Sequence, residues 1–549
     1  MITKLEQQTK NLIDSLKAVC HSYGLSNGGD EYKIITQTFL YKFLNDKFYY
    51  DVKNSPYIDE ELKQKNKWVE NYRQMDEQEV ENFIDDISNE YLFAFNPEHL
   101  ISVLWEKQNL NNFGEIFDDT MKELSELNEK IYITETTEGT QVNLFGPIIS
   151  ENISDVNKRS DFARALINKL VDFSFEDAFG QSYDFFSTIF EYLIKDYNTN
   201  GGGSYAEYYT PQSIAKIISE LLVDGDKTLK NVSCYDPSAG TGTLVISLSH
   251  LIGEDKSSIF TQDISQKSST MLKMNLILNN LVSSLRNIIV GNTLTNPFHK
   301  SKNGDLMTFD FVVSNPPFKM DFADTRDTLE AMKSRFWAGV PNIPKQKKTS
   351  MSIYTLFIQH VINSIKPNSG KGAIVVPTGF ITAKSGIEQK ILERIVKDKL
   401  VYGCISMPSN VFANTGTNVS VLFFDKSKKY EKVILIDASK LGEKYKDGTQ
   451  QRTRLTDKDI EHIISTFREK KEVDSFSKLV SYDEISEKNN SLSAGQYFDI
   501  KIDYVDITEE EFESQMNEYR KELKQLFDES NELQSEILEQ LGKLKYGKS

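Results

Sequence analysis

The chain shows three successive patterns of hydrophobic and polar positions. Up to about residue 150, apolar side chains recur at helical spacing, as Phe39, Phe43 and Leu44 do within one polar stretch. From residue 151 to about 470, short β-rich runs alternate with amphipathic helical stretches. The remainder closes with one long helical pattern. We therefore predict a helical N-terminal domain at 1–150, an α/β domain at 151–470 and a C-terminal helical segment at 471–549.

The middle region predicts a mainly parallel sheet with helices on both faces. Short β-rich runs occupy residues 231–240, 257–265, 309–317, 372–380 and 402–410. Helical stretches lie between the later runs, which is typical of βαβ units. Such sheets bind their ligands at the carboxyl ends of the strands. The residues at the ends of four predicted strands are Asp236, Asp263, Asn315 and Pro377.

The last helical pattern begins with a capping box and continues as an apolar stripe. Thr508 and Glu511 have the spacing of the box. The stripe alternates between steps of four and three, with Ser530 and Gln540 as polar interruptions: Phe512, Met516, Tyr519, Leu523, Leu526, Leu533, Ile537 and Leu544. A stripe of this kind packs against the same chain or against another subunit.

Composition is that of a soluble globular protein. The chain has 549 residues, 39% of them hydrophobic and 26% charged, and a run of roughly eighteen apolar residues, enough for a membrane span, is missing. The first residues also lack the apolar core of a signal peptide. Three distant cysteines, Cys20, Cys234 and Cys404, form no CxxC pair, and six histidines form no cluster. We expect a cytoplasmic protein with no membrane partner, no disulfide and no metal.

The net charge of -17 argues against a chain that holds nucleic acid over its whole surface. It leaves room for a local basic groove, or for a partner that supplies positive charge. One candidate is the loop at 334–350, where Lys345, Lys347 and Lys348 could contact phosphates. An ordinary solvated loop explains the same residues equally well.

The stretch at 235–244 places an acid, a turn of small residues and a helix in succession. Gly240 and Gly242 allow a ligand to approach the backbone closely. The dinucleotide fingerprint is incomplete, because Val245 occupies the position of its third glycine. Asp263, at the end of the next strand, can accept hydrogen bonds from both hydroxyls of a ribose. The alternative is that Asp236 and Asp263 are helix N-caps.

A further helix start precedes this turn. Thr210 is a suitable N-cap and Pro211 a suitable first helical residue. Taken alone, this pattern predicts only an ordinary amphipathic helix.

The tetrapeptide Asn315-Pro316-Pro317-Phe318 carries the sharpest chemical signal. The two prolines end the strand and fix the backbone. The Asn315 amide oxygen and the Pro316 carbonyl can then accept both protons of one planar amino group, such as N6 of adenine. Phe318 can stack on the base, as aromatic rings do with flipped bases.

In these motifs and in their order, nearly the whole chain resembles S-adenosylmethionine-dependent adenine-N6 DNA methyltransferases. More narrowly, it resembles the modification subunit of type I restriction–modification systems. The matching stretches are "EYYTPQ", "DPSAGTGTL", "VGNTL", "NPPF", "VVPTGFI" and "MPSNVFANTGTNVSVLFFDK". The fold implied is a Rossmann-like methyltransferase sheet with a helical N-terminal domain and a C-terminal helical tail.

The resemblance also implies the site. Catalysis falls to Asn315, Pro316, Pro317 and Phe318, without a metal. Asn292 stands where the family usually has Asp, so its oxygen would accept from the cofactor's adenine without charge. The residues implied to bind S-adenosyl-L-methionine are Glu207, Tyr208, Tyr209, Thr210, Pro211, Gln212, Asp236, Ser238, Ala239, Gly240, Thr241, Gly242, Asp263 and Asn292.

The partners implied are double-stranded DNA with a flipped adenine, a DNA-specificity subunit, a second copy of this chain and a restriction/translocase subunit. The C-terminal helix would contact the specificity subunit. Two other classes stay open. A protein-glutamine methyltransferase would use the same planar-amide chemistry, although those enzymes usually carry Tyr where this chain has Phe318. A non-enzymatic component of a DNA complex would require a ruined cofactor site.

Overall fold

The computed structural model of the chain divides into two compact units, 1–497 and 498–549. The structure describes residues 4–25, 29–55, 68–88, 93–129, 134–136, 141–142, 145–179, 188–193, 210–412, 418–447, 450–498 and 507–543. None of the helices in these ranges is long and apolar enough to cross a membrane.

The N-terminal part of the first unit is helical, as the spacing predicts. Its helices are α1 Lys4–Ser22, α2 Gly29–Asn54, α4 Trp68–Tyr72, α5 Glu77–Ser88, α6 Ile101–Glu106, α7 Phe113–Leu127 and α9 Val156–Val171. Helix α2 is buried on nearly every side. Its aromatic residues form edge-to-face contacts with others of the same region, such as Phe39 with Phe175 at 5.2 Å between ring centres.

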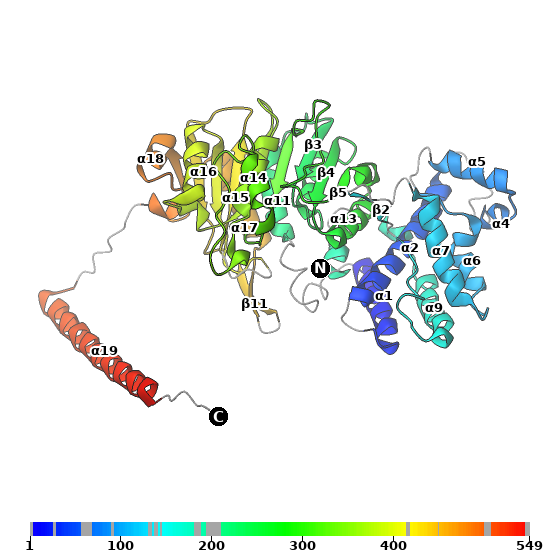
Figure 1. The fold of residues 1–549 in the computed structure, drawn as a ribbon, viewed down its shortest axis with the longest axis horizontal. Coiled ribbons are helices and arrows are strands. Elements are labelled where there is room, and N and C mark those ends of the chain that lie inside the picture. Colours follow the sequence, from blue (N-terminus) through cyan, green and yellow to red (C-terminus); the bar gives the residue numbers. More distant parts are fainter. Residues whose placement is uncertain are drawn as a thin grey trace. The chain divides into compact units, whose positions relative to one another are not determined.

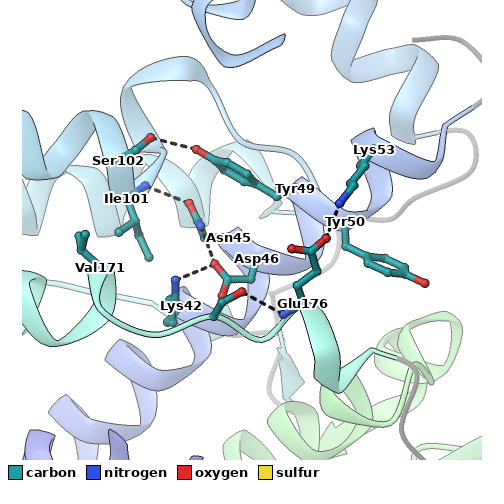
Figure 2. Close-up of a pocket in the computed structure, with 11 residues that line it drawn as sticks. Lys42, Asn45, Asp46, Tyr49, Tyr50, Lys53, Ile101, Ser102, Val171 and Glu176 are labelled. Carbon is teal, nitrogen blue, oxygen red and sulfur yellow. Dashed lines mark hydrogen bonds and ion pairs between the residues drawn. The ribbon is translucent and has the colours of Figure 1, made fainter. Parts of the chain in front are cut away.

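A cavity of about 180 Å³ lies beside α2, and its polar groups join three segments (Figure 2). Lys42 Nζ lies 2.8 Å from Asp46 Oδ1, and Asp46 Oδ2 accepts from the backbone N–H of Phe175. Asn45 Oδ1 accepts from the N–H of Ile101 at the start of α6. Burial raises the pKa of Asp46. These bonds satisfy buried polar groups and fix α2 against α6 and the segment after α9.

The rest of the first unit is built on a sheet of eleven strands among the described residues (Figure 1). Its order is β13-β10-β8-β9-β7-β6-β3-β4-β5-β1-β2. The strands are β1 Thr134–Thr136, β2 Gln141–Val142, β3 Val232–Asp236, β4 Ser257–Asp263, β5 Ile288–Val290, β6 Phe311–Ser314, β7 Lys371–Pro377, β8 Val401–Ser406, β9 Val419–Asp425, β10 Lys432–Asp437 and β13 Ser477–Ser481. Strands β11 Glu443–Asp447 and β12 Gln450–Arg454 form a separate two-stranded ribbon.

The sheet is mainly parallel, which confirms the predicted α/β class. Strands β7, β6, β3, β4, β5 and β1 run parallel to one another. Strand β9 lies antiparallel between β7 and β8. Residues on either side of the boundary predicted at 150 belong to one unit, since the β1–β2 hairpin pairs with β5.

Helices pack against the sheet, and four of them share one core with it. The helices are α11 Gln212–Val223, α12 Thr243–Ile252, α13 Gln266–Leu278, α14 Arg326–Ala331, α15 Tyr354–Ser364, α16 Gly386–Lys397, α17 Asp457–Glu469 and α18 Tyr482–Glu487. Buried residues of α11, α12, α13 and α17 share one core with alternate residues of β6 and β7. From β3 the chain moves outward through β4 to β5, then returns to β6 on the other side of β3. This reversal between β3 and β6 is where an open α/β sheet places its ligand.

The second unit contains α19 Glu509–Lys543. The predicted capping box is present: Thr508 Oγ1 accepts from the Glu511 N–H, and Glu511 Oε2 accepts from the Thr508 N–H. No residue of α19 is buried. Leu523 and Leu533 of the predicted stripe are 52% and 58% exposed.

Candidate active site

The predicted strand-end residues meet at one edge of the sheet. Strands β3, β4 and β7 end at Asp236, Asp263 and Pro377, and Asn315 follows β6 directly. Because these strands are parallel, their carboxyl ends lie side by side. The edge therefore brings Asp236, Asp263 and Asn315 to the position where the strand order reverses.

Neither acid is a helix N-cap, which removes the alternative reading of these residues. The N-caps of α12 and α13 are Gly242 and Ser265. Asp263 instead joins two loops, since its Oδ2 accepts from the Gly240 N–H at 2.9 Å and its Oδ1 from the Ser265 N–H at 2.8 Å. Asp236 Oδ1 accepts from the Ser238 N–H at 2.9 Å.

Both acids are held in conditions that disfavour their charge. Burial raises the pKa of Asp236 to about 8, and it also raises the pKa of Asp263. Neither carboxylate pairs with a lysine or arginine in the part of the chain that the structure describes. Such acids are suited to a ligand that brings positive charge.

The turn between them needs its glycines for two different reasons. Gly240 (φ +53°) and Gly242 (φ +83°) both adopt the left-handed conformation. A Cβ on Gly242 would also lie 2.0 Å from Leu272 Cδ1 of α13. Gly242 is therefore required by the packing of α12 on α13, whereas Gly240 donates its N–H to Asp263.

A cavity of about 100 Å³ is lined by Asp263 and by Pro237, the residue after Asp236. Ser238, Asp263, Asn292 and Pro317 are predicted site residues that line it. The sequence analysis missed its other lining residues, which are Pro237, Ile264, Ser265, Ser268, Thr293, Leu294, Met320, Ile353 and Phe357. The sequence did offer a signal for Ile264, because it is an apolar residue directly after a strand-end acid. In the structure its side chain is 60% exposed.

Asn292 uses its amide oxygen within its own turn. Its Oδ1 accepts from the N–H groups of Leu294 at 2.9 Å and Thr295 at 3.3 Å. The expected bond from this oxygen to a cofactor's adenine would have to compete with these two. That role for Asn292 stays a prediction.

The buried Arg335 holds the same turn, at residues 292–295, through hydrogen bonds to its backbone. Arg335 donates from Nη1 to the carbonyl of Leu294 at 2.5 Å and from Nη2 to that of Thr293 at 2.7 Å. Its Nη2 and Nε also lie 2.8 and 3.2 Å from His360 Nδ1 of α15. Burial lowers the pKa of Arg335 to about 10, and burial followed by the Arg335 charge lowers the pKa of His360. His360 is thus neutral and accepts through Nδ1.

The loop at 334–350 is only partly a solvated loop. Arg335, Phe336 and Ala338 are buried, and the Ala338 N–H donates to Gln359 Oε1 at 2.7 Å. The three lysines predicted to contact phosphates, at 345, 347 and 348, are exposed. Their contact with DNA stays a prediction.

Asn315 lies beside the start of α11. Its Nδ2 donates to Thr210 Oγ1 at 3.1 Å. Pro316 is buried, while Asn315, Pro317 and Phe318 are partly exposed. The Phe318 ring stands edge-on to Tyr354, with 6.3 Å between ring centres.

The remaining predicted residues divide into two groups. Pro211, Gln212, Ala239 and Thr241 belong to the described segments next to this edge, and Thr241 O accepts from Asn275 Nδ2. Glu207, Tyr208 and Tyr209 lie outside the described residues. Within the described ranges, no group of three or more His, Cys, Asp or Glu residues has the arrangement of a metal site.

Comparison with protein families matches residues 181–503 to the family described as N-6 DNA Methylase. The methylase subunit of the type I restriction enzyme MjaIX from Methanocaldococcus jannaschii is 30% identical over 399 residues, which cover 69% of this chain and 66% of that protein. The corresponding MpnII subunit from Mycoplasma pneumoniae is 27% identical over 419 residues, 74% of each chain.

Solved structures agree on the fold. A type I restriction–modification methyltransferase subunit from Streptococcus thermophilus aligns with a TM-score of 0.71 at 22% identity, over 90% of this chain and 100% of that chain. A modification subunit of a putative type I restriction enzyme from Vibrio vulnificus aligns with a TM-score of 0.51 at 16% identity, over 88% and 94%. The family match contains every strand from β3 onward, the cavity and Asn315.

Proposed function

Because this chain belongs to the N-6 DNA methylase family, we propose that it transfers a methyl group from S-adenosyl-L-methionine to N6 of adenine in DNA. We place it as the modification subunit of a type I restriction–modification system. One observation carries the proposal: Pro317 of the Asn315-Pro316-Pro317-Phe318 stretch and the buried acid Asp263 line one cavity, at the carboxyl edge of the sheet where β3 also ends in Asp236.

The side chains that line the cavity suit the cofactor in polarity and charge. Ile264, Leu294 and Phe357 offer apolar surface for the adenine ring. Asp263 can accept from the ribose hydroxyls, although its two oxygens already hold backbone N–H groups. Asp236 can balance a positive charge of the methionine part. S-adenosylmethionine supplies an electrophilic methyl group on a sulfonium, which becomes a neutral thioether once the methyl group has left.

The chain's own residues act on the target base. Asn315 Oδ1 and the Pro316 carbonyl accept the two protons of N6, which orients its lone pair and concentrates charge on the nitrogen. Phe318 stacks on the flipped adenine. When N6 gains the methyl group, it gives up one of its two protons to solvent.

The proposed partners fit the negative net charge of this chain. The net charge of -17 is consistent with a partner that supplies positive charge for DNA binding, and we propose that a specificity subunit is this partner. We propose that α19 contacts that specificity subunit, because an apolar stripe with a few polar positions is the pattern of a specific helix–helix contact. A second copy of this chain and a restriction/translocase subunit would complete the assembly.

The test is transfer of a labelled methyl group to DNA, with and without the specificity subunit encoded beside this gene. We expect N6-methyladenine in the DNA, identified by mass spectrometry of the nucleosides, only when both subunits are present. Transfer to a glutamine-containing peptide instead of DNA would support the protein-methyltransferase alternative. Absence of any transfer, with S-adenosylmethionine bound, would support the non-enzymatic alternative.

A further inference from the structure

Thr210 occupies the position predicted for a helix N-cap, yet its side chain does not cap α11. The helix begins at Gln212, and its N-cap is Pro211, which makes no side-chain capping bond. Thr210 is 5% exposed, and its Oγ1 accepts from Asn315 Nδ2 at 3.1 Å. The Thr210 hydroxyl, which the local pattern predicted to cap the helix, is therefore bonded to Asn315, 105 positions away in sequence.

This bond decides which end of the Asn315 amide faces the substrate. The amide has a donor end and an acceptor end of nearly equal shape, and the proposed chemistry uses the acceptor. With Nδ2 held by Thr210, Oδ1 points away from Thr210. No described residue donates a hydrogen bond to Oδ1. The acceptor is therefore available to an incoming amino group.

The residue before Asn315 is held from the cofactor side. Ser314 is fully buried, and its Oγ lies 2.7 Å from Ser238 Oγ. Ser238 in turn donates its N–H to Asp236. Two segments thus fix Asn315: the one before α11 holds its side chain, and the one that lines the cavity at Ser238 holds its neighbour.

We propose that Thr210 is a positioning residue, which orients the Asn315 amide for the methyl transfer and couples the start of α11 to the catalytic strand end. The inference rests on the proposed function and adds to it. It differs from the role expected for Thr210 from its motif, which is contact with the cofactor. The two roles predict different kinetic defects.

The test compares Thr210→Val, Thr210→Ser and the control Thr261→Val. Valine keeps the shape of threonine without the hydroxyl, and serine keeps the hydroxyl. Thr261 is buried on β4, and its hydroxyl has no hydrogen-bond partner among the residues that the structure describes. Each variant is assayed with the specificity subunit for kcat on its DNA site and, by calorimetry, for the Kd of S-adenosylmethionine.

For Thr210→Val we expect kcat to fall by about tenfold or more, because the reacting group loses its orientation. The Kd of S-adenosylmethionine should stay within about threefold of wild type. Thr210→Ser should recover most of kcat, and Thr261→Val should match wild type. If thermal melting shows that Thr210→Val folds poorly, kcat and the Kd of S-adenosylmethionine are measured on Thr210→Ala instead.

Two results would overturn the inference. One is an unchanged kcat in Thr210→Val. The other is a weaker Kd for S-adenosylmethionine together with a loss of activity that saturating cofactor fully restores. Failure of the proposed function is a separate result, since it would show as a wild-type complex that leaves adenine unmodified.

Discussion

Asn315 combines an acceptor that the proposed reaction uses with a donor that Thr210 holds. Replacing Asn315 with alanine removes the acceptor while leaving the cofactor cavity intact, because Asn315 does not line it. We expect kcat to fall by roughly 10²–10³ with an almost unchanged Kd for S-adenosylmethionine. Single-turnover methyl transfer and calorimetry measure the two quantities. Near-normal turnover would remove Asn315 from the mechanism.

If Asp236 faces the bound cofactor as proposed, binding of S-adenosylmethionine should depend on pH. Its pKa is raised to about 8, so most of this carboxyl is protonated near neutral pH in the free protein. A positively charged ligand favours the carboxylate, so binding releases a proton and affinity should rise as the pH increases from about 6 to about 8. We expect roughly a three- to tenfold gain over that range, flattening above the raised pKa.

Calorimetry across this range measures the effect, with Asp236→Asn as the control. The cofactor's amino group titrates near the same pH, but it does so with both proteins, so their difference isolates Asp236. The same shift predicts that the free protein loses stability as pH rises from about 4 to about 8, because the unfolded chain ionises this carboxyl freely. Equal pH profiles for the two proteins would contradict the assignment.

At the scale of elements, Arg335 links the turn at 292–294 to α15. Arg335→Lys keeps the charge but cannot serve both carbonyls and His360 together. We expect S-adenosylmethionine to bind about tenfold more weakly, since the turn lines its cavity and charged hydrogen bonds are strong. Arg326→Lys is the matched control, because Arg326 pairs with Glu330. Lower stability with unchanged affinity would restrict Arg335 to a role in folding.

Several helices and strands could be predicted from the sequence, whereas their order in the sheet and some tertiary contacts could not. Hydrophobic alternation and strand-end acids predicted β3, β4, β6, β7 and β8, and a parallel sheet then placed Asp236 and Asp263 together. The insertion of β9 between β7 and β8 was not predictable, because periodicity identifies strands without giving their order. Thr210 matched a local N-cap pattern, but a tertiary contact with Asn315 took its hydroxyl. The hydrogen bonds from Arg335 to the turn could not be predicted from the sequence, since a lone arginine in a loop normally faces solvent.

At the scale of the whole molecule, we propose that the first compact unit binds the cofactor and that the second contacts the specificity subunit. Every residue that lines the cofactor cavity precedes position 420, whereas α19 belongs to the unit at 498–549. We propose that a partner helps this acidic chain to engage DNA, and the stripe on α19 is our candidate for the contact with that partner. Binding of the cofactor and methylation of DNA should therefore be separable.

Truncation before Thr508 is the direct test of this separation. We expect a folded protein that binds S-adenosylmethionine within about twofold of full-length affinity, because its cavity and sheet are complete. It should not co-purify with the specificity subunit, and it should not methylate the DNA site. In the full-length chain, the double variant Leu523→Glu and Leu533→Glu should show the same defects, because buried charge at such seam positions is costly. Lys524→Glu, on the polar side of α19, is its control. Full-strength association of the truncated chain would move the interface to the first unit, most plainly to its helical N-terminal part.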